Sequence, residues 1–241
     1  MIKRWQSGAT WAASNDANMN LNLAAWSGNI EVVEMHVIKG RDINLTDSNG
    51  WTALHFTLWN MLTNMITFLL EITSEKNWVS KQNEDGISAL HFAAWNGDIQ
   101  IINILLNAGA DISSQDKEGL TPLDWGAKTG HVDLMKVLME AGADISGLRK
   151  HGFTPMRWAA KNGEVVAIKS LKEAGADVSE QSHDGRTPMH EAARYGHVDA
   201  IKALQAMGAD VSAKTDAGGG TPMHEAATYG HVDAIKALGA R

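Results

Sequence analysis

The sequence predicts an all-α fold built from stacked helix–turn–helix units, and two regularities carry this prediction. The tripeptide Gly-Ala-Asp begins at residues 109, 142, 175 and 208, which are 33 residues apart each time. The four prolines fall on one position of the same period, at Pro122, Pro155, Pro188 and Pro222. A period of this length is typical of a small helical unit that cannot bury its apolar faces alone. Stacked copies can bury them, and the stack is a solenoid.

The unit that starts at Thr121 shows how each element arises. Thr121 can cap a helix whose first position is Pro122, where the missing N–H removes no useful donor. Gly130 ends this helix, because glycine readily adopts the left-handed conformation of a C-cap. A second helix is predicted over residues 132–140, where apolar side chains cover much of the circumference. The polar stretch 144–152 then returns the chain to the next unit.

Composition excludes several classes of protein. Apolar residues make up 44% and charged residues 20% of the chain, which is typical of a globular protein. The formal net charge of −7 provides no overall basic footprint for nucleic acid. The absence of cysteine excludes disulfides, thiolate metal ligands and a cysteine nucleophile. No apolar run reaches the roughly 18 residues of a membrane helix and no secretion signal is visible, so we expect a cytoplasmic protein without membrane insertion.

Residues 185–197 read Gly-x-Thr-Pro-Met-His-x-Ala-Ala-x-x-Gly-His, and a Gly-Ala-Asp turn follows them. This pattern resembles the ankyrin repeat family, and the resemblance covers roughly residues 18–241. It implies an ankyrin-repeat solenoid of about seven units, the first and last incomplete, joined by β-hairpin loops. Residues 1–17 fit no unit, and we expect them to form an N-terminal extension or lid in which Trp5 and Trp11 pack on the first unit.

Three departures from the pattern stand out. Asn60 and Met61 replace the turn glycine, and the following exit is three residues longer than elsewhere. The chain stops at Arg241 inside the predicted second helix of the last unit, so we expect this end to fray or the natural chain to continue. Residues 187–204 and 221–238 differ at one position, which indicates either a recent duplication or a consensus-designed segment.

Histidines recur with the repeat rather than with the spacing of metal ligands. In the ankyrin family the histidine of Thr-Pro-x-His makes structural hydrogen bonds between neighbouring loops, and here that position holds His55, His91, His190 and His224. His131, His197 and His231 share another repeat position, and His151 and His183 lie at loop tips. No phosphate-binding loop, nucleophile elbow or dinucleotide turn occurs. We therefore expect no metal site, no cofactor and no catalysis.

Two repeat positions are candidates for binding a partner. The position two residues before the first-helix glycine, called the helix-end row here, holds Trp26, Trp59, Trp95, Lys128, Lys161 and Arg194. The resemblance implies that this row, with the adjacent Tyr195, lies on a concave surface. The position after the loop-tip glycine, called the loop-tip row, holds Trp51, Ile87, Leu120, Phe153 and Arg186, and we expect its apolar members to be exposed.

Tryptophan and arginine are enriched among binding hot spots, so the helix-end row favours an interface. The alternative is that its tryptophans pack sideways on each other and only stiffen the wall. Trp125 and Trp158 occupy a different position and are predicted to belong to the core.

The sequence therefore predicts a non-catalytic, monomeric scaffold that binds another protein or peptide on its concave groove and loop tips. Because the helix-end row changes from aromatic to cationic, the expected partner has an apolar and an acidic portion. If the protein is a bacterial effector, we expect it to be secreted into a host cell. Two alternatives stay open: a targeting domain of a larger enzyme or effector continuing beyond Arg241, and an engineered repeat protein without a native partner.

Overall fold

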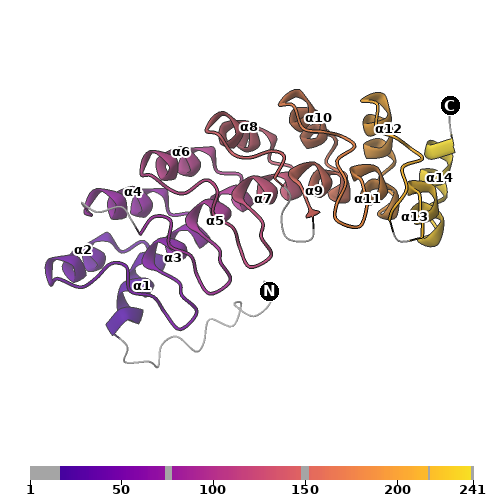
Figure 1. Cartoon of the computed structure of the whole chain (residues 1–241). Helices are drawn as coiled ribbons and strands as arrows, with labels where there is room; N and C mark the ends of the chain where they lie inside the picture. The colour runs from indigo at the N-terminus through magenta and orange to yellow at the C-terminus, as the bar shows by residue number, and fades with distance from the viewer. Residues whose placement is uncertain (1–16, 74–77, 148–151, 217, 240–241) are drawn as a thin grey trace. The chain divides into compact units, whose positions relative to one another are not determined.

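The computed structural model describes residues 17–73, 78–147, 152–216 and 218–239, and it confirms the all-α prediction. Fourteen helices lie in these ranges, in seven consecutive pairs (Figure 1). The pairs are α1 (Ala17–Ser27) and α2 (Ile30–Ile38), α3 (Ala53–Trp59) and α4 (Thr63–Glu71), α5 (Ala89–Asn96) and α6 (Ile99–Asn107), α7 (Pro122–Thr129) and α8 (Val132–Glu140), α9 (Pro155–Asn162) and α10 (Val165–Glu173), α11 (Pro188–Arg194) and α12 (Val198–Ala206), and α13 (Pro222–Thr228) and α14 (Val232–Gly239).

The chain divides into two compact units. Unit 1 comprises Met1–Phe92 and Ile104–Ala110. In unit 1, α1 packs against α3, and each of these first helices packs against the second helix of its own pair. The core includes Leu21, Leu58 and Leu69, which are buried because neither pair alone could cover them.

Unit 2 comprises Ala93–Asn103 and Asp111–Arg241. Its first helices α7, α9, α11 and α13 pack in succession, and α8, α10, α12 and α14 form a second row beside them (Figure 1). The same repeat positions are buried in successive pairs, and these are alanines on the first helices and leucines on the second: Ala127, Ala160, Ala193, Leu138, Leu171 and Leu204. Alanine brings the first helices close together, and leucine fills the space between the two rows.

The expected helix signals act as predicted in unit 2. Helices α7, α9, α11 and α13 begin at the four prolines, each preceded by a threonine in extended conformation. Thr121 shows the cap, since its side chain accepts from the backbone N–H of Asp124 while the Asp124 carboxylate accepts from the Thr121 N–H at 2.8 Å. Gly130 ends α7 with φ +72°. Short helices of this kind depend on such caps, because propensity alone does not hold them.

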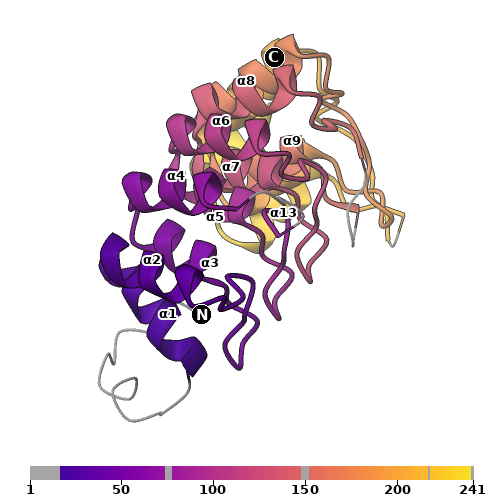
Figure 2. The same ribbon diagram turned by 90° about the vertical axis from the view of Figure 1, so that its left-hand side faces the viewer.

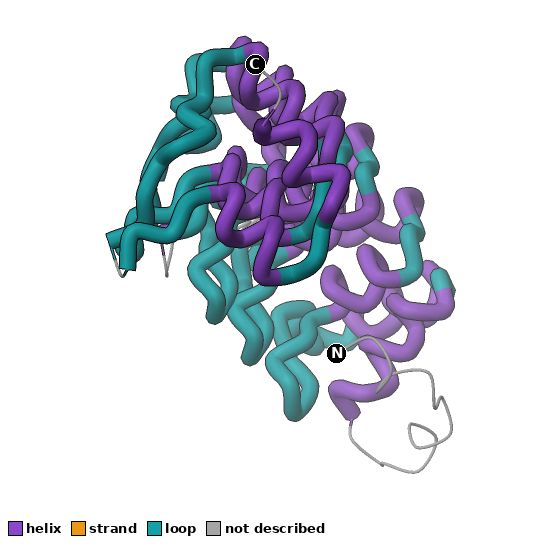
Figure 3. Tube along the Cα trace, turned by 90° about the vertical axis from the view of Figure 1, so that its right-hand side faces the viewer, coloured by secondary structure: helices purple, strands orange, loops and turns teal. Residues whose placement is uncertain are grey.

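The connecting loops differ from the expected β-hairpins, because the described residues form turns and no β-strand (Figure 3). A side chain organises each tip instead of a strand ladder. The Asp116 Oδ1 atom accepts from the N–H groups of Glu118 and Leu120 at 2.9 and 2.8 Å, and Asp47 serves its loop in the same way. A backbone hydrogen bond also closes each of these two tips, from the Asp116 N–H to the Leu120 carbonyl at 2.9 Å and from the Asp47 N–H to the Trp51 carbonyl at 3.0 Å, but neither tip forms a strand.

A backbone hydrogen bond joins two neighbouring loop tips in each unit, and in unit 1 it runs from the Glu84 N–H to the Asn49 carbonyl at 2.9 Å. The N–H of Asp216 donates to the carbonyl of Asp184 at 3.0 Å, and the loops that precede α11 and α13 lie side by side (Figure 2). Gly185 sits at this contact with φ +77°, and a Cβ atom there would lie 2.7 Å from the Asp216 nitrogen. Glycine is needed here both for its conformation and for the close approach.

The missing turn glycine of the second pair leaves a strained residue. Met61 adopts φ +54°, and it is the one non-glycine residue with positive φ among those the structure describes. Its turn is otherwise regular, because the N–H groups of Met61 and Leu62 donate to the carbonyls of Leu58 and Thr57. The fold therefore imposes a left-handed turn on a side chain that disfavours it.

We expect Met61→Gly to stabilise the protein by about 0.5–1 kcal/mol, because relief of the left-handed strain exceeds the added freedom of the unfolded chain. The matched control is Met35→Gly, a similarly exposed methionine inside α2, where glycine should cost about 1 kcal/mol. Urea unfolding curves of the two variants measure both effects. A loss of stability in Met61→Gly would contradict the assignment of strain.

The expected N-terminal lid with Trp5 and Trp11, and also His151, lie outside the described residues. Within the described ranges, no helix is long and apolar enough to cross a membrane.

Candidate functional site

The tryptophans of the helix-end row lie where the sequence predicted an exposed position. Trp26, Trp59 and Trp95 lie at or near the ends of α1, α3 and α5, with exposed fractions of 45%, 43% and 40%. Trp26 and Trp59 belong to unit 1, and Trp95 belongs to unit 2. Each of these large apolar side chains keeps much of its surface in water, although a tryptophan gains free energy when it is buried.

In unit 1, Trp59 rests on a cluster of buried rings. It meets Trp51 edge-on at 5.8 Å between ring centroids and Phe92 edge-on at 5.9 Å. Trp51 itself lies 5.3 Å from Phe56 and 5.1 Å from Phe92. Trp59 therefore packs on rings outside the helix-end row, which differs from the alternative in which the tryptophans of the row pack on each other, and 43% of its surface stays exposed.

The expectation of exposed apolar side chains in the loop-tip row is wrong. Trp51 and Leu120 are buried, and Ile87 and Phe153 are half-buried. The residue after the tip glycine returns toward the helices, so its side chain enters the packing instead of pointing away from the loop. Arg186 is half-buried and pairs with Asp184 at 3.3 Å and Glu225 at 3.0 Å.

In unit 2, the cations of the helix-end row lie over aromatic rings. The Nζ atoms of Lys128 and Lys161 lie 4.9 and 4.8 Å from the centroid of Trp158, and Arg194 lies 4.9 Å from that of Tyr229. Lys161 also lies 5.5 Å from the ring of Tyr195. These cation–π contacts fix the side chains in place.

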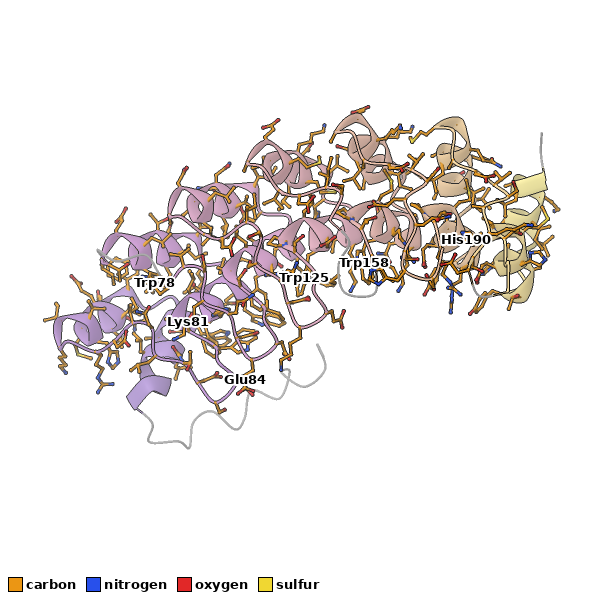
Figure 4. All side chains as sticks on the ribbon, in the orientation of Figure 1. Trp78, Lys81, Glu84, Trp125, Trp158 and His190 are labelled. Carbon is orange, nitrogen blue, oxygen red and sulfur yellow. The ribbon has the colours of Figure 1, made fainter. Side chains whose placement is uncertain are left out.

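Trp125 and Trp158 come from the successive first helices α7 and α9 and lie on the same side of them (Figure 4). Trp158 is buried, as predicted for a core residue. Trp125 is half-buried, meets Trp95 edge-on at 5.7 Å, and donates from Nε1 to the Asp116 carboxylate at 2.9 Å. The rings of unit 2 thus support the exposed side chains from beneath.

A buried ion pair in unit 2 was missed by sequence reasoning. Arg157 takes the place of the histidine in Thr-Pro-x-His and is 1% exposed. Its Nη2 lies 2.5 Å from the Glu191 Oε1 atom in the next pair, and its Nη1 donates to the Gly152 carbonyl at 2.8 Å. The signal was present as an arginine at a histidine position, with a glutamate 34 residues later.

We expect Arg157→Met to destabilise the protein by about 3–5 kcal/mol, because Glu191 would remain as a buried charge without a partner. The double variant Arg157→Met/Glu191→Met should lose less than Arg157→Met alone, since it removes both charges. Chemical denaturation of the wild type, the two single variants and the double variant completes the cycle. Additive losses would show that the two side chains are not coupled.

Histidine side chains join successive pairs. The Nε2 atom of His55 donates to the Ile87 carbonyl at 3.0 Å, and that of His190 to the Gly220 carbonyl at 3.1 Å. These two contacts confirm the predicted structural hydrogen bonds of this histidine to the neighbouring loop. A second set, formed by His131, His197 and His231, binds the carbonyls of Trp95, Lys161 and Arg194 at 3.1, 2.9 and 2.9 Å. Within the described ranges, no three His, Asp or Glu side chains are grouped as a metal site would require.

Burial keeps the ring of His55 neutral, and its hydrogen bonds determine which nitrogen carries the proton. The Thr52 N–H points at Nδ1 from 3.2 Å, so Nδ1 accepts and the ring proton resides on Nε2. Burial lowers the pKa of His55 to about 4, despite the opposing effect of its bond to Ile87. Burial also lowers the pKa of His190. A second proton would face the Thr52 N–H in a buried site, where a charged ring is poorly solvated.

We expect the contribution of His55 to the free energy of unfolding to be full above pH 6.5 and to be lost between pH 6.5 and 4. In that window His55 binds a proton in the unfolded chain and not in the folded one, so its full contribution is about 3 kcal/mol at most. His55→Gln should be less stable at neutral pH and should lose less stability over this window. Urea unfolding at several pH values measures the difference, and parallel curves would contradict it.

The comparisons with known proteins point to one family. A family model described as ankyrin repeats, in three copies, matches residues 21–116, 109–182 and 158–240, and no catalytic domain is detected. Over 96 residues, the chain is 32% identical to ankyrin repeat and SOCS box protein 3 of Bos taurus and 30% identical to that of Homo sapiens. Each match covers 40% of this chain and 18% of the relative, so the chain spans less than a fifth of their length.

Proposed function

The chain belongs to the ankyrin repeat family, and on that premise we propose that it is a non-catalytic scaffold that binds a protein partner in the cytoplasm. Ankyrin repeats typically mediate protein–protein interactions. The observation that carries the proposal for this chain is the exposure of Trp26, Trp59 and Trp95 at one repeat position, while Trp51, Trp78 and Trp158 are buried. Exposed tryptophans at one recurring position are typical of an interface.

The packing of these tryptophans favours binding. Trp59 is held by Trp51 and Phe92 in unit 1, and Trp95 is held by Trp125 in unit 2. A ring that is already oriented loses little conformational freedom when a partner covers it. The stiffening role and the binding role are therefore compatible.

The remaining candidates define the partner's second property. Lys128, Lys161 and Arg194 are half-buried cations, and Tyr195 next to them is exposed. Together with Trp95 of the same unit, they suit a peptide or helix with an apolar portion and an acidic portion. Of the loop-tip row, Ile87, Phe153 and Arg186 keep partial exposure and could contact its edge, whereas Trp51 and Leu120 are too deeply buried to do so.

The test begins with a partner isolated by crosslinking and pull-down from the native host. Trp59→Ala and Trp95→Ala should each weaken its binding by about 2 kcal/mol, or roughly thirtyfold, mainly through a faster off-rate. The matched controls are Ile38→Ala and Val166→Ala, which truncate exposed apolar side chains on the second helices α2 and α10. These controls should leave the affinity unchanged.

Reversing the charges of Lys128, Lys161 and Arg194 should mainly slow association, and the effect should shrink at high salt. A partner whose affinity is insensitive to the tryptophan variants and to the charge reversal would overturn the proposal, because its binding surface would then lie elsewhere.

A second candidate function is that of a targeting module in a larger protein. The relatives are named for a SOCS box beside their ankyrin repeats, and the matched region covers 18% of their length. Sequencing of the complete reading frame in the native host distinguishes this from a free-standing scaffold. A stop codon directly after Arg241 would exclude an additional C-terminal domain.

A further inference from the structure

The cations of the helix-end row in unit 2 are not equivalent. Arg194 lies 4.0 Å from the Glu225 carboxylate. Lys128 and Lys161 have no carboxylate within the 4.0 Å of an ion pair among the described residues, although both are half-buried. Both ammonium groups lie over the same ring, that of Trp158. Two like charges thus share one indole without a neutralising anion.

The sequence around Arg157 explains this difference. Glu225 lies four residues after Thr221, and the equivalent residues after Thr187 and Thr154 are Glu191 and Trp158. Arg194 therefore meets a glutamate in the following pair. Lys161 does not, because Glu191 is bound to Arg157 in the interior. Lys128 meets Trp158 instead of a carboxylate.

The surroundings of the two lysines suit acidic side chains. Cation–π contacts orient an ammonium group but leave its N–H donors available, and a half-buried site strengthens attraction to an anion. Phe153 and Tyr195 lie 5.4 and 5.5 Å from the Lys161 Nζ atom and offer apolar walls for methylene groups. Phosphate is commonly bound by arginine forks, but Arg157 and Arg194 are already paired with Glu191 and Glu225.

We propose that Lys128 of α7 and Lys161 of α9, whose ammonium groups both lie over Trp158, form the binding site for glutamate or aspartate side chains of the partner protein. This inference rests on the proposed function and makes it specific. Of the three cations in the proposed function, the two lysines are the main binding site for the acidic portion, and Arg194 contributes less because it lies near Glu225, a carboxylate that it shares with Arg186.

The probe is a short fluorescein-labelled peptide of alternating glutamate and alanine, titrated at low ionic strength and followed by anisotropy. Lys128→Gln/Lys161→Gln should weaken its binding about tenfold. Arg194→Gln, the matched change at the same repeat position, should alter it less than about twofold. Binding should disappear in about 1 M salt, where the Debye length is about 3 Å.

Two peptide controls identify the ligand chemistry. The glutamine–alanine peptide, which carries no charge on its side chains, should not bind. The phosphoserine–alanine peptide carries more negative charge than the glutamate–alanine peptide, and its affinity should exceed that of the glutamate peptide only by the amount that this extra charge explains. Equal losses in the double variant and in Arg194→Gln would overturn the proposal, as would equal binding of the glutamine peptide. Loss of phosphoserine binding alone in the double variant would assign the site to phosphate and overturn it too.

The isolated partner separates this inference from the function on which it rests. If Trp59→Ala and Trp95→Ala weaken partner binding and Lys128→Gln/Lys161→Gln does not, the scaffold function stands and the binding site for acidic side chains is refuted. If none of these variants affects the partner, the proposed binding surface itself is refuted. Melting curves of all variants check that the fold is retained.

Discussion

Successive helix pairs in the described parts of the chain satisfy each other's polar groups and cover each other's apolar faces, and the rest of the structure depends on this constraint. His55 binds the Ile87 carbonyl, and His197 binds the Lys161 carbonyl while its ring lies against Gly163. A Cβ atom at position 163 would lie 2.8 Å from the Nδ1 atom of His197, so the histidine of one pair requires a glycine in the previous pair. With the 33-residue period, equivalent histidines in successive pairs bind equivalent backbone carbonyls of the pair before them, as His197 and His231 do.

One substitution within this scheme changes the character of unit 2. At the position where His55 and His190 bind a carbonyl of the next loop, Arg157 binds a carboxylate of the next helix. Because Glu191 is bound to Arg157, Lys161 near the end of α9 has no ion-pair partner among the described residues. The arginine at position 157 thereby alters the electrostatics of the nearby surface, because it takes the carboxylate of Glu191 that Lys161 could otherwise meet.

The exposed rings show how stability and recognition share the same residues. Trp59 contributes one edge to a buried aromatic cluster and presents the rest to water, and Lys161 lies over Trp158 and Phe153. Side chains fixed in this way need little further ordering when a partner binds. In each unit, buried rings therefore orient the exposed side chains that a partner could contact.

The sequence by itself determined the helical repeat and its boundaries, because caps, glycine turns and periodicity act over a few residues. Its resemblance to the ankyrin family implied the exposed position of Trp26, Trp59 and Trp95. It did not reveal that Trp51 and Leu120 turn inward, or that Arg157 pairs with Glu191. Burial and pairing depend on which side chains of the adjacent pair fill the same space. These contacts join residues of adjacent helix pairs that are about one period apart in the sequence, so only the tertiary structure decided them.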